Sequence, residues 1–366
     1  MLRDQLGQLL LAGVPGLELD VASAALFRRV QPGGYILFGR NITSALQLRK
    51  LIDDLRDLSD FEPIITIDQE GGRVSRLRLI GNEPPNAQQL REKNDISLVR
   101  RHGQITGRLL RLFGFNLDLC PVLDISFDDE ADNSLRSRCY GRDVEEVVRL
   151  AGAFNAALRE EGIKSCGKHF PGYSAAGVDA HHDLPRIDRS RSELEDEELA
   201  VFRQLASQLD SMMICHAWYP CFDQERTPAS LSPRVVSEVL RRELEFDGLV
   251  MTDDLDMGAI YNEYSLEETI RLAIAAGNDL AMICHRVDAI GEARDALAGV
   301  ARGDLDRALG NVSSFKEQMT SPHAFSEEAF HRLDEEVWDL RVAVLGAKEA
   351  AKRSPEDGKR SPVETY

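Results

Sequence analysis

The chain has 366 residues, of which 43% are hydrophobic and 29% charged, a composition typical of a globular protein with a sizeable core. Its formal net charge of −18 argues against a nucleic-acid partner, because such proteins present basic patches to the phosphate backbone. No apolar run is long enough to span a membrane, and the scattered cysteines suit reduced thiols, so we expect a soluble cytoplasmic protein without a membrane partner.

Short apolar segments alternate with longer amphipathic ones along the chain. The N-terminal segment is expected to be a helix that leads into the first strand, and not a signal peptide. Eight strands are predicted, at residues 9–14, 35–39, 63–68, 115–124, 165–170, 211–217, 248–254 and 279–285. Several of them are apolar almost throughout, which is typical of strands that are covered on both faces.

The segments between the strands carry helix start signals. Helix N-termini are predicted at Asp143, Ser192, Ser232 (followed by Pro233) and Ser265, and glycines at 162 and 277 end two of these helices. Alternating strands and helices build a parallel sheet through right-handed crossovers. Eight strands favour an α/β fold of the (β/α)8 TIM-barrel type, formed as one domain by residues 1–345, and a doubly wound open sheet is the alternative. Residues 346–366 hold one large aliphatic side chain and are expected to form a disordered tail.

Polar residues follow five of the predicted strands, at the end where a barrel of this type carries its chemistry. They are Asp68, Asp124, Lys168 with His169, His216, and Asp253 with Asp254. One such residue alone is as consistent with a rim salt bridge as with a site. Five strand ends that meet at one mouth favour a polar pocket.

Two of these segments have local features of interest. In DQEGGRVSRL (68–77) an acid is followed by a Gly-Gly turn and by Arg73 and Arg76, which suits recognition of sugar hydroxyls but also a plain salt bridge. In VMTDDLDM (250–257) Asp253 and Asp254 are neighbours on a strand, so only one of them can point into the barrel. That residue is a candidate nucleophile or base, and the alternative is a helix-capping acid.

The segment KHFPGYSAAGVDAHHDLP (168–185) ends in a histidine pair. Asp179 is two residues before His181, so its carboxylate is placed to orient the imidazole for proton transfer, and small residues before it would let the pair move. The alternative is an exposed polar loop. A metal site would use His169, His181, His182, Asp183, His216 and Asp253, but the sequence lacks the H-E-x-x-H pattern, and we expect no metal or other cofactor.

Several motifs occur together in a characteristic order. They are ILFGRN (36–41), DQEGGRVSR (68–76), PVLD (121–124), SRCYG (137–141), KHFPG with D-A-H (168–181), PASLSP (228–233), ELEFDGLVMTDDLDM (243–257) and AGNDLAMIC (276–284). This set resembles the β-N-acetylglucosaminidases of glycoside hydrolase family 3. The resemblance extends from the first predicted strand to beyond the eighth.

The resemblance implies a single (β/α)8 barrel and a retaining two-step mechanism without metal. It implies Asp253 as the nucleophile and His181 as the acid/base, oriented by Asp179. Sugar binding is implied for Asp68, Arg76, Arg138, Lys168 and His169. The implied substrates are saccharides with terminal N-acetylglucosamine, such as muropeptide fragments of peptidoglycan.

The chain departs from the family pattern in the loop. Tyr173 and Ser174 stand where the family commonly has His-Gly, and Ala180 stands where it commonly has serine. Because the loop is altered, a silent sugar-binding barrel remains an alternative. A phosphorylase on the same scaffold is a second alternative, because a histidine acid/base repels phosphate less than a carboxylate would, and a metal-dependent hydrolase is a third.

Overall fold

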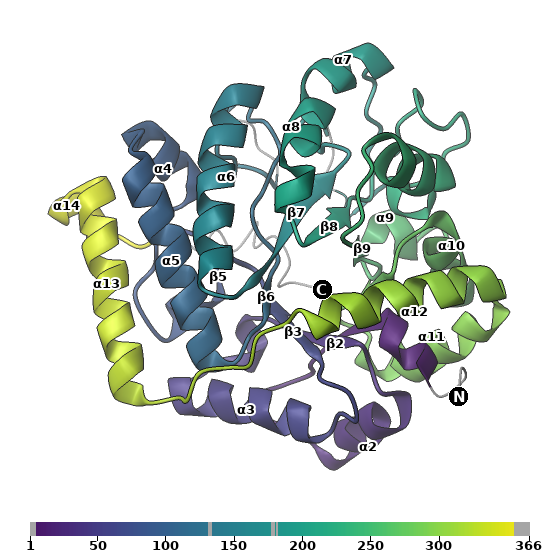
Figure 1. The fold of residues 1–366 in the computed structure, drawn as a ribbon, viewed down its shortest axis with the longest axis horizontal. Coiled ribbons are helices and arrows are strands. Elements are labelled where there is room, and N and C mark those ends of the chain that lie inside the picture. Colours follow the sequence, from purple (N-terminus) through teal and green to yellow (C-terminus); the bar gives the residue numbers. More distant parts are fainter. Residues whose placement is uncertain (1–4, 131–133, 177–179, 181, 355–366) are drawn as a thin grey trace.

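Eight parallel strands close into a barrel in the computed structural model, which describes residues 5–130, 134–176, 180 and 182–354 (Figure 1). The strands are β1 (Leu10–Gly13), β2 (Gly34–Leu37), β3 (Ile64–Ile67), β6 (Leu117–Asp118), β7 (Lys164–Phe170), β8 (Ser211–Ile214), β9 (Leu249–Asp254) and β10 (Leu280–Ile283). Their order around the barrel is β1-β10-β9-β8-β7-β6-β3-β2. The predicted TIM-type barrel is confirmed, and each predicted strand overlaps an observed one.

The strand predicted at 115–124 is much shorter than expected. Only Leu117–Asp118 form β6, and the chain beyond them meets β7 again at an isolated bridge between Val122 and Lys168. Pro121 lies between these two points, and a proline has no N–H to give to a ladder. The strand is therefore interrupted, while its polar end at Asp124 still reaches the barrel mouth.

Helices surround the barrel and shield the outer faces of its strands (Figure 1). The α-helices are α2 (Val21–Val30), α3 (Ala45–Asp57), α4 (Ala87–Lys93), α5 (Ile96–Phe113), α6 (Val144–Glu160), α7 (Arg191–Asp196), α8 (Glu198–Leu205), α9 (Gly258–Tyr261), α10 (Leu266–Ala276), α11 (Ile290–Ala296), α12 (Arg302–Glu317), α13 (Glu327–Leu345) and α14 (Ala347–Ala350). A π-helical segment, η6 (Arg234–Glu243), precedes β9, and short 3₁₀ segments include η1 (Leu6–Leu9), η2 (Gly39–Asn41) and η3 (Arg76–Leu79). Strand residues are buried on both faces, which explains their apolar sequences.

The helix start signals gave mixed results. Asp143 and Ser265 cap α6 and α10 through their side chains, as predicted. The prediction at Ser192 is wrong, because Ser190 caps α7 in a capping box with Glu193, which has the same spacing two residues earlier. At Ser232 the predicted helix start is confirmed, because Pro233 is the first helical residue and the Ser232 carbonyl oxygen accepts from the Val236 N–H at 3.0 Å. The Ser232 side chain does not cap this helix, since its hydroxyl donates to Asp223 Oδ2 at 2.9 Å.

Part of the segment predicted to be a disordered tail is structured. Residues 347–350 form α14, in which Ala350 is buried, and the Ser354 hydroxyl donates to Glu83 Oε1 at 2.7 Å. The buried Arg341 of α13 contacts the same carboxylate at 3.0 Å. A shared buried carboxylate therefore ties this segment to the barrel, which its composition alone does not indicate. Residues 355–366 lie outside the described residues.

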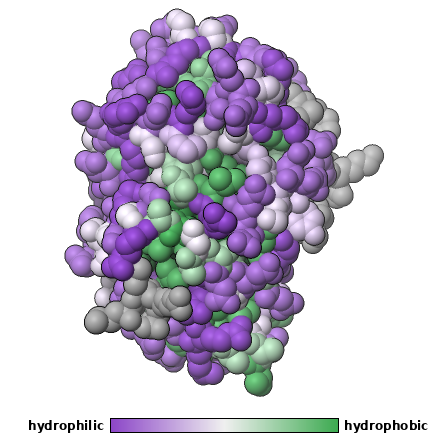
Figure 2. Space-filling model, turned by 90° about the vertical axis from the view of Figure 1, so that its right-hand side faces the viewer, coloured by the Kyte–Doolittle hydropathy of each residue, from purple (hydrophilic) through white to green (hydrophobic). Residues whose placement is uncertain are grey.

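The surface is largely hydrophilic on the face shown in Figure 2, where apolar side chains are gathered near the middle of the view. None of the helices in the described part of the chain combines the length and the apolar character that crossing a membrane would take.

Candidate active site

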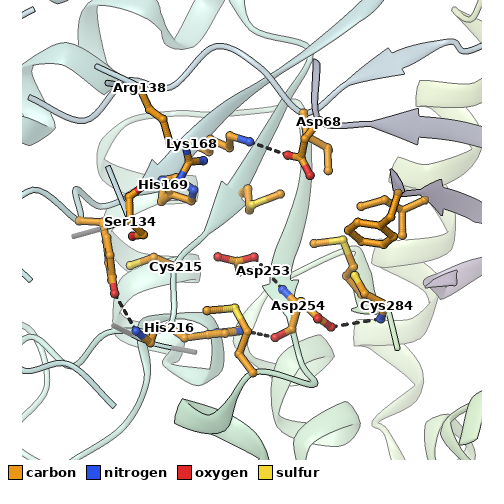
Figure 3. A pocket seen from close by; sticks show the side chains of 18 residues that line it. Asp68, Ser134, Arg138, Lys168, His169, Cys215, His216, Asp253, Asp254 and Cys284 are labelled. Carbon is orange, nitrogen blue, oxygen red and sulfur yellow. Dashed lines mark hydrogen bonds and ion pairs between the residues drawn. The ribbon is translucent and has the colours of Figure 1, made fainter. Parts of the chain in front are cut away.

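A pocket lies at the carboxyl ends of the barrel strands. Its lining includes Asp68, Arg138, Lys168, His169, His216, Asp253 and Asp254, which come from five different strand ends or the loops behind them (Figure 3). The polar strand ends singled out in the sequence thus meet at one pocket, apart from Asp124, which lies behind His169. Apolar side chains such as Phe38, Met213 and Met257 form the rest of the wall.

Two cations and two carboxylates form a buried cluster on one side of the pocket. Lys168 Nζ lies 2.7 Å from Asp68 Oδ1 and 2.6 Å from Glu70 Oε1. Arg138 binds Glu70 with two parallel hydrogen bonds, of 2.8 Å from Nε and 2.7 Å from Nη2. Each charge is buried, and each has an opposite charge within hydrogen-bonding distance, which such burial requires.

The charges in this cluster stabilise one another. Burial alone would raise the pKa of Glu70, but the Arg138 and Lys168 cations outweigh it and hold that pKa well below its usual range. Burial likewise opposes the charged form of Lys168, yet Asp68 and Glu70 raise its pKa. Glu70 and Lys168 therefore stay ionised at neutral pH, and Lys168 presents a fixed positive charge to the hydroxyl groups of a ligand.

Arg76 lies next to this cluster, although it is not among the residues that line the pocket. Its Nη2 atom lies 3.6 Å from Asp68 Oδ2, and its guanidinium lies 5.9 Å from the centre of the Phe38 ring. A hairpin of β4 (Gln69–Gly71) and β5 (Val74–Ser75) leads to it. Gly71 and Gly72 have φ values of +114° and +54°, so the predicted glycine turn is confirmed. Arg73 points elsewhere and donates to the carbonyl oxygens of Ser134 and Arg136.

His169 is oriented by a carboxylate at the next strand end. Its Nδ1 lies 2.7 Å from Asp124 Oδ2, and Asp124 Oδ1 accepts a hydrogen bond of 2.6 Å from the Tyr173 backbone N–H. Asp124 has no solvent exposure, so it is a supporting group and does not face the ligand. The imidazole is thus held with its other edge toward the cavity, which suits a binding role.

Asp253 and Asp254 differ in environment, as their alternation on β9 predicts. The Asp253 side chain is half-buried in the cavity wall, and its Oδ1 accepts a 2.8 Å hydrogen bond from the Asp254 backbone N–H. The Asp254 carboxyl is turned toward β10, where its Oδ1 accepts from the Cys284 N–H at 3.1 Å. Asp253 is therefore the more accessible of the two carboxylates.

Of the histidines considered as metal ligands, His169 and His216 have other partners. His216 bonds to Ser230 Oγ at 2.8 Å and to the Asp254 carbonyl oxygen at 2.9 Å, and His182 and Asp183 are exposed. In the described ranges, no three His, Cys, Asp or Glu residues are grouped so as to hold a metal ion. The predicted dyad residues Asp179 and His181 lie outside the described residues.

Ala180, which separates the dyad residues in sequence, is described and buried. Its N–H donates to the Tyr173 hydroxyl at 2.9 Å, and its carbonyl oxygen accepts from the Ala259 N–H at 3.0 Å. The Ser174 hydroxyl accepts a 2.9 Å bond from the Ile125 N–H. Tyr173 and Ser174, two of the residues that depart from the family pattern, therefore hold the described part of the loop against its surroundings.

Sequence reasoning missed Glu70. It lies two residues after Asp68, and side chains two residues apart in an extended segment point the same way. The spacing could therefore have predicted that Glu70 lies on the same side of the segment as Asp68. Asp118 was also missed, because it lies inside a strand. Burial raises its pKa to about 8, and its Oδ1 accepts from the Gln69 N–H at 3.0 Å.

Three comparisons relate the chain to known proteins. Residues 1–314 match the family model of the glycosyl hydrolase family 3 N-terminal domain. A beta-hexosaminidase of Pseudomonas aeruginosa is 34% identical over 277 residues, which cover 75% of this chain and 82% of that protein. A glycoside hydrolase family 3 beta-N-acetylglucosaminidase from a Paenibacillus species superposes with a TM-score of 0.85 at 32% identity, covering 93% of this chain and 68% of that one. The native NagZ structure from Neisseria gonorrhoeae has a TM-score of 0.78 at 29% identity, with coverages of 91% and 97%.

Proposed function

Because the chain belongs to glycosyl hydrolase family 3 and is a glycoside hydrolase, we propose that it is a retaining exo-β-N-acetylglucosaminidase. The observation that carries this proposal is the position of Asp253. It is an accessible carboxylate in the same cavity as the buried cluster of Asp68, Lys168 and Arg138. We infer that the charged groups of this cluster bind the sugar hydroxyls and that Asp253 attacks the sugar.

In the first step, an Asp253 oxygen bonds to the anomeric carbon as the bond to the leaving oxygen breaks. His181 gives that oxygen a proton, so the aglycone leaves as a neutral alcohol. In the second step, neutral His181 takes a proton from water, whose oxygen displaces Asp253. Two inversions at one carbon give net retention.

The acid/base assignment rests on the sequence motif, in which Asp179 precedes His181 by two residues. Most retaining glycosidases use a second carboxylate instead. An imidazole adds no further negative charge next to Asp253 when it is neutral. This property suits a pocket whose lining already includes the Asp68 and Asp254 carboxyl groups.

We further propose that the natural substrates are cytoplasmic saccharides derived from peptidoglycan. The names of the relatives support the sugar, and the Asp-His motif supports the mechanism. The aglycone is tested by comparing the disaccharide of N-acetylglucosamine and N-acetylmuramic acid with chitobiose. A preference for chitobiose would contradict the peptidoglycan assignment.

The central experiment traps the enzyme with an activated fluorinated N-acetylglucosamine analogue and reads the mass of the intact protein. The wild type should gain one sugar on Asp253, and Asp253→Asn should gain none. Asp247→Asn is the matched control, because Asp247 is an exposed residue just before the start of β9, the strand that ends in Asp253–Asp254. A labelled Asp253→Asn protein would exclude Asp253 as the nucleophile.

Turnover of aryl N-acetylglucosaminides with and without phosphate separates hydrolysis from phosphorolysis. We expect free sugar in both cases, and a sugar 1-phosphate would show a phosphorylase. Loss of activity with a chelator and its recovery with zinc would instead show a metal-dependent hydrolase.

A further inference from the structure

A line of three side chains lies behind the proposed nucleophile, and the family motifs quoted above assign it no role. It runs from Arg40 in η2 to His285 after β10 and to Asp254 at the end of β9. We propose that His285 is a positioning residue for the Asp253 carboxylate and that it acts through Asp254. The proposal rests on the assignment of Asp253 as the nucleophile.

Asp254 is the link to Asp253, because its backbone N–H donates to Asp253 Oδ1 at 2.8 Å. The rest of Asp254 is held from several sides. Its Oδ1 accepts from the backbone N–H groups of Asp256 at 3.0 Å and Cys284 at 3.1 Å. Its carbonyl oxygen lies 2.9 Å from His216 Nε2, and carbonyl oxygens only accept, so His216 is the donor. The orientation of Asp253 therefore follows the placement of Asp254.

The remaining oxygen, Asp254 Oδ2, lies 3.4 Å from His285 Nε2. The other ring nitrogen, Nδ1, lies 3.2 Å from Arg40 Nη1. A guanidinium has donors and no acceptor, so Nδ1 must be the acceptor of this contact. The ring proton is then on Nε2, the ring nitrogen nearer to Asp254, although Nε2 and Asp254 Oδ2 make no hydrogen bond in this arrangement.

The surroundings keep His285 in this orientation. The Arg40 guanidinium also donates to the carbonyl oxygens of Val14 at 3.0 Å and Cys284 at 2.6 Å, and it lies 4.5 Å from the centre of the Phe38 ring. The His285 ring packs on the same phenyl ring at a centroid distance of 5.4 Å. A cation with this many contacts fixes both the position and the tautomer of the imidazole.

The protonation state of Asp254 depends on the groups that surround it. Burial raises its pKa to about 8, and the Asp256 and Asp253 charges add to that shift. The titratable and charged groups that face it are Asp253, Asp256 (itself paired with Arg286), His216, Cys284, His285 and, behind His285, Arg40. Near neutral pH the Asp254 carboxyl is thus mostly protonated, so it does not place a second negative charge beside Asp253.

The test is a double-mutant cycle on the rate of trapping by the activated fluorinated sugar. His285→Leu should slow trapping roughly 10- to 100-fold, because misplacement of a reacting group costs about that much. His285→Gln keeps an N–H donor and should recover part of the rate. In an Asp254→Asn background, His285→Leu should have little further effect, since its route to Asp253 is already altered. Fully additive losses would overturn the proposal.

Two further readouts separate positioning from a general packing defect. Inhibition by N-acetylglucosamine should be unchanged in His285→Leu, and His331→Leu on the exposed face of α13 is the control for the substitution itself. An activated leaving group departs without being protonated, so the trapping rate does not depend on the acid/base residue. An inflection of the trapping rate near pH 8 therefore reports the ionisation of Asp254. His285→Leu should move it upward, because the lost N–H stabilised the carboxylate. If trapping needs Asp253 but ignores His285, this inference fails and the proposed function stands. If Asp253→Asn is still trapped, the proposed function fails first.

Discussion

Replacing Glu70 by glutamine is expected to destabilise the protein by about 3–5 kcal/mol, the usual cost of removing one partner from a buried ion pair. Glu70 is 5% exposed and is the shared partner of Arg138 and Lys168, at 2.7 and 2.6 Å. The neutral amide would leave two buried cations with Asp68 as the carboxylate of the cluster. Glutamine has nearly the same shape, so the change tests charge and not volume.

The loss in melting temperature follows from the chain length. Unfolding entropy of about 2.1 cal/mol/K per residue gives roughly 0.8 kcal/mol/K for 366 residues, so the midpoint should fall by about 4–6 °C. Differential scanning calorimetry at pH 7 measures this shift. Glu328→Gln is the control, because Glu328 is 83% exposed in its pair with Arg332 and should change stability by less than about 0.5 kcal/mol.

The pH dependence provides a second check on the cause. The folded-state pKa of Glu70 lies well below its usual value, so its ionised form stabilises the protein above the unfolded-state pKa of about 4.3. The difference between wild type and Glu70→Gln should therefore be constant above that pH and shrink as the pH falls below it. Inhibition by N-acetylglucosamine should also weaken at least about tenfold, since Arg138 and Lys168 lose a shared anchor. A midpoint within 1 °C of the wild type, or a difference that persists unchanged at low pH, would refute the charge argument.

Three other substitutions test separate parts of the structure. Tyr173→Phe removes the hydroxyl that accepts the Ala180 N–H and should lower turnover of substrates with poor leaving groups more than that of activated ones; equal losses would argue against a link to the acid. Asp118→Asn should stabilise the protein at pH 8 but not at pH 4, because the raised pKa of Asp118 makes its ionisation costly, up to about 1.4 kcal/mol per pH unit; calorimetry at both pH values checks this. Arg341→Leu should cost about 3–5 kcal/mol by leaving Glu83 with fewer partners, and an unchanged urea midpoint would contradict this value.

Local patterns in the sequence were enough to predict the barrel and much of its mouth. Apolar runs give eight strands because strands covered on both faces have no polar face to present. The strand-end residues Asp68, Lys168, His169 and Asp253 could be placed together because parallel strands end at one side of a barrel. The motifs were also sufficient to indicate the family, which the comparisons confirm.

The partners of these residues could not be predicted in the same way. Glu70 and Arg138 are 68 positions apart in the chain, and His285 is 245 positions from Arg40. No period or cap connects residues at such separations, so only the closed barrel decides which charges neutralise one another. The same reason applies to pKa values: burial raises that of Asp254 to about 8, while its neighbour Asp253 is half-exposed. Local sequence patterns were thus sufficient to predict the number of strands, the barrel mouth and the candidate nucleophile. The pairing, protonation and support of the groups around that nucleophile follow from the folded chain, because these properties depend on contacts between distant segments.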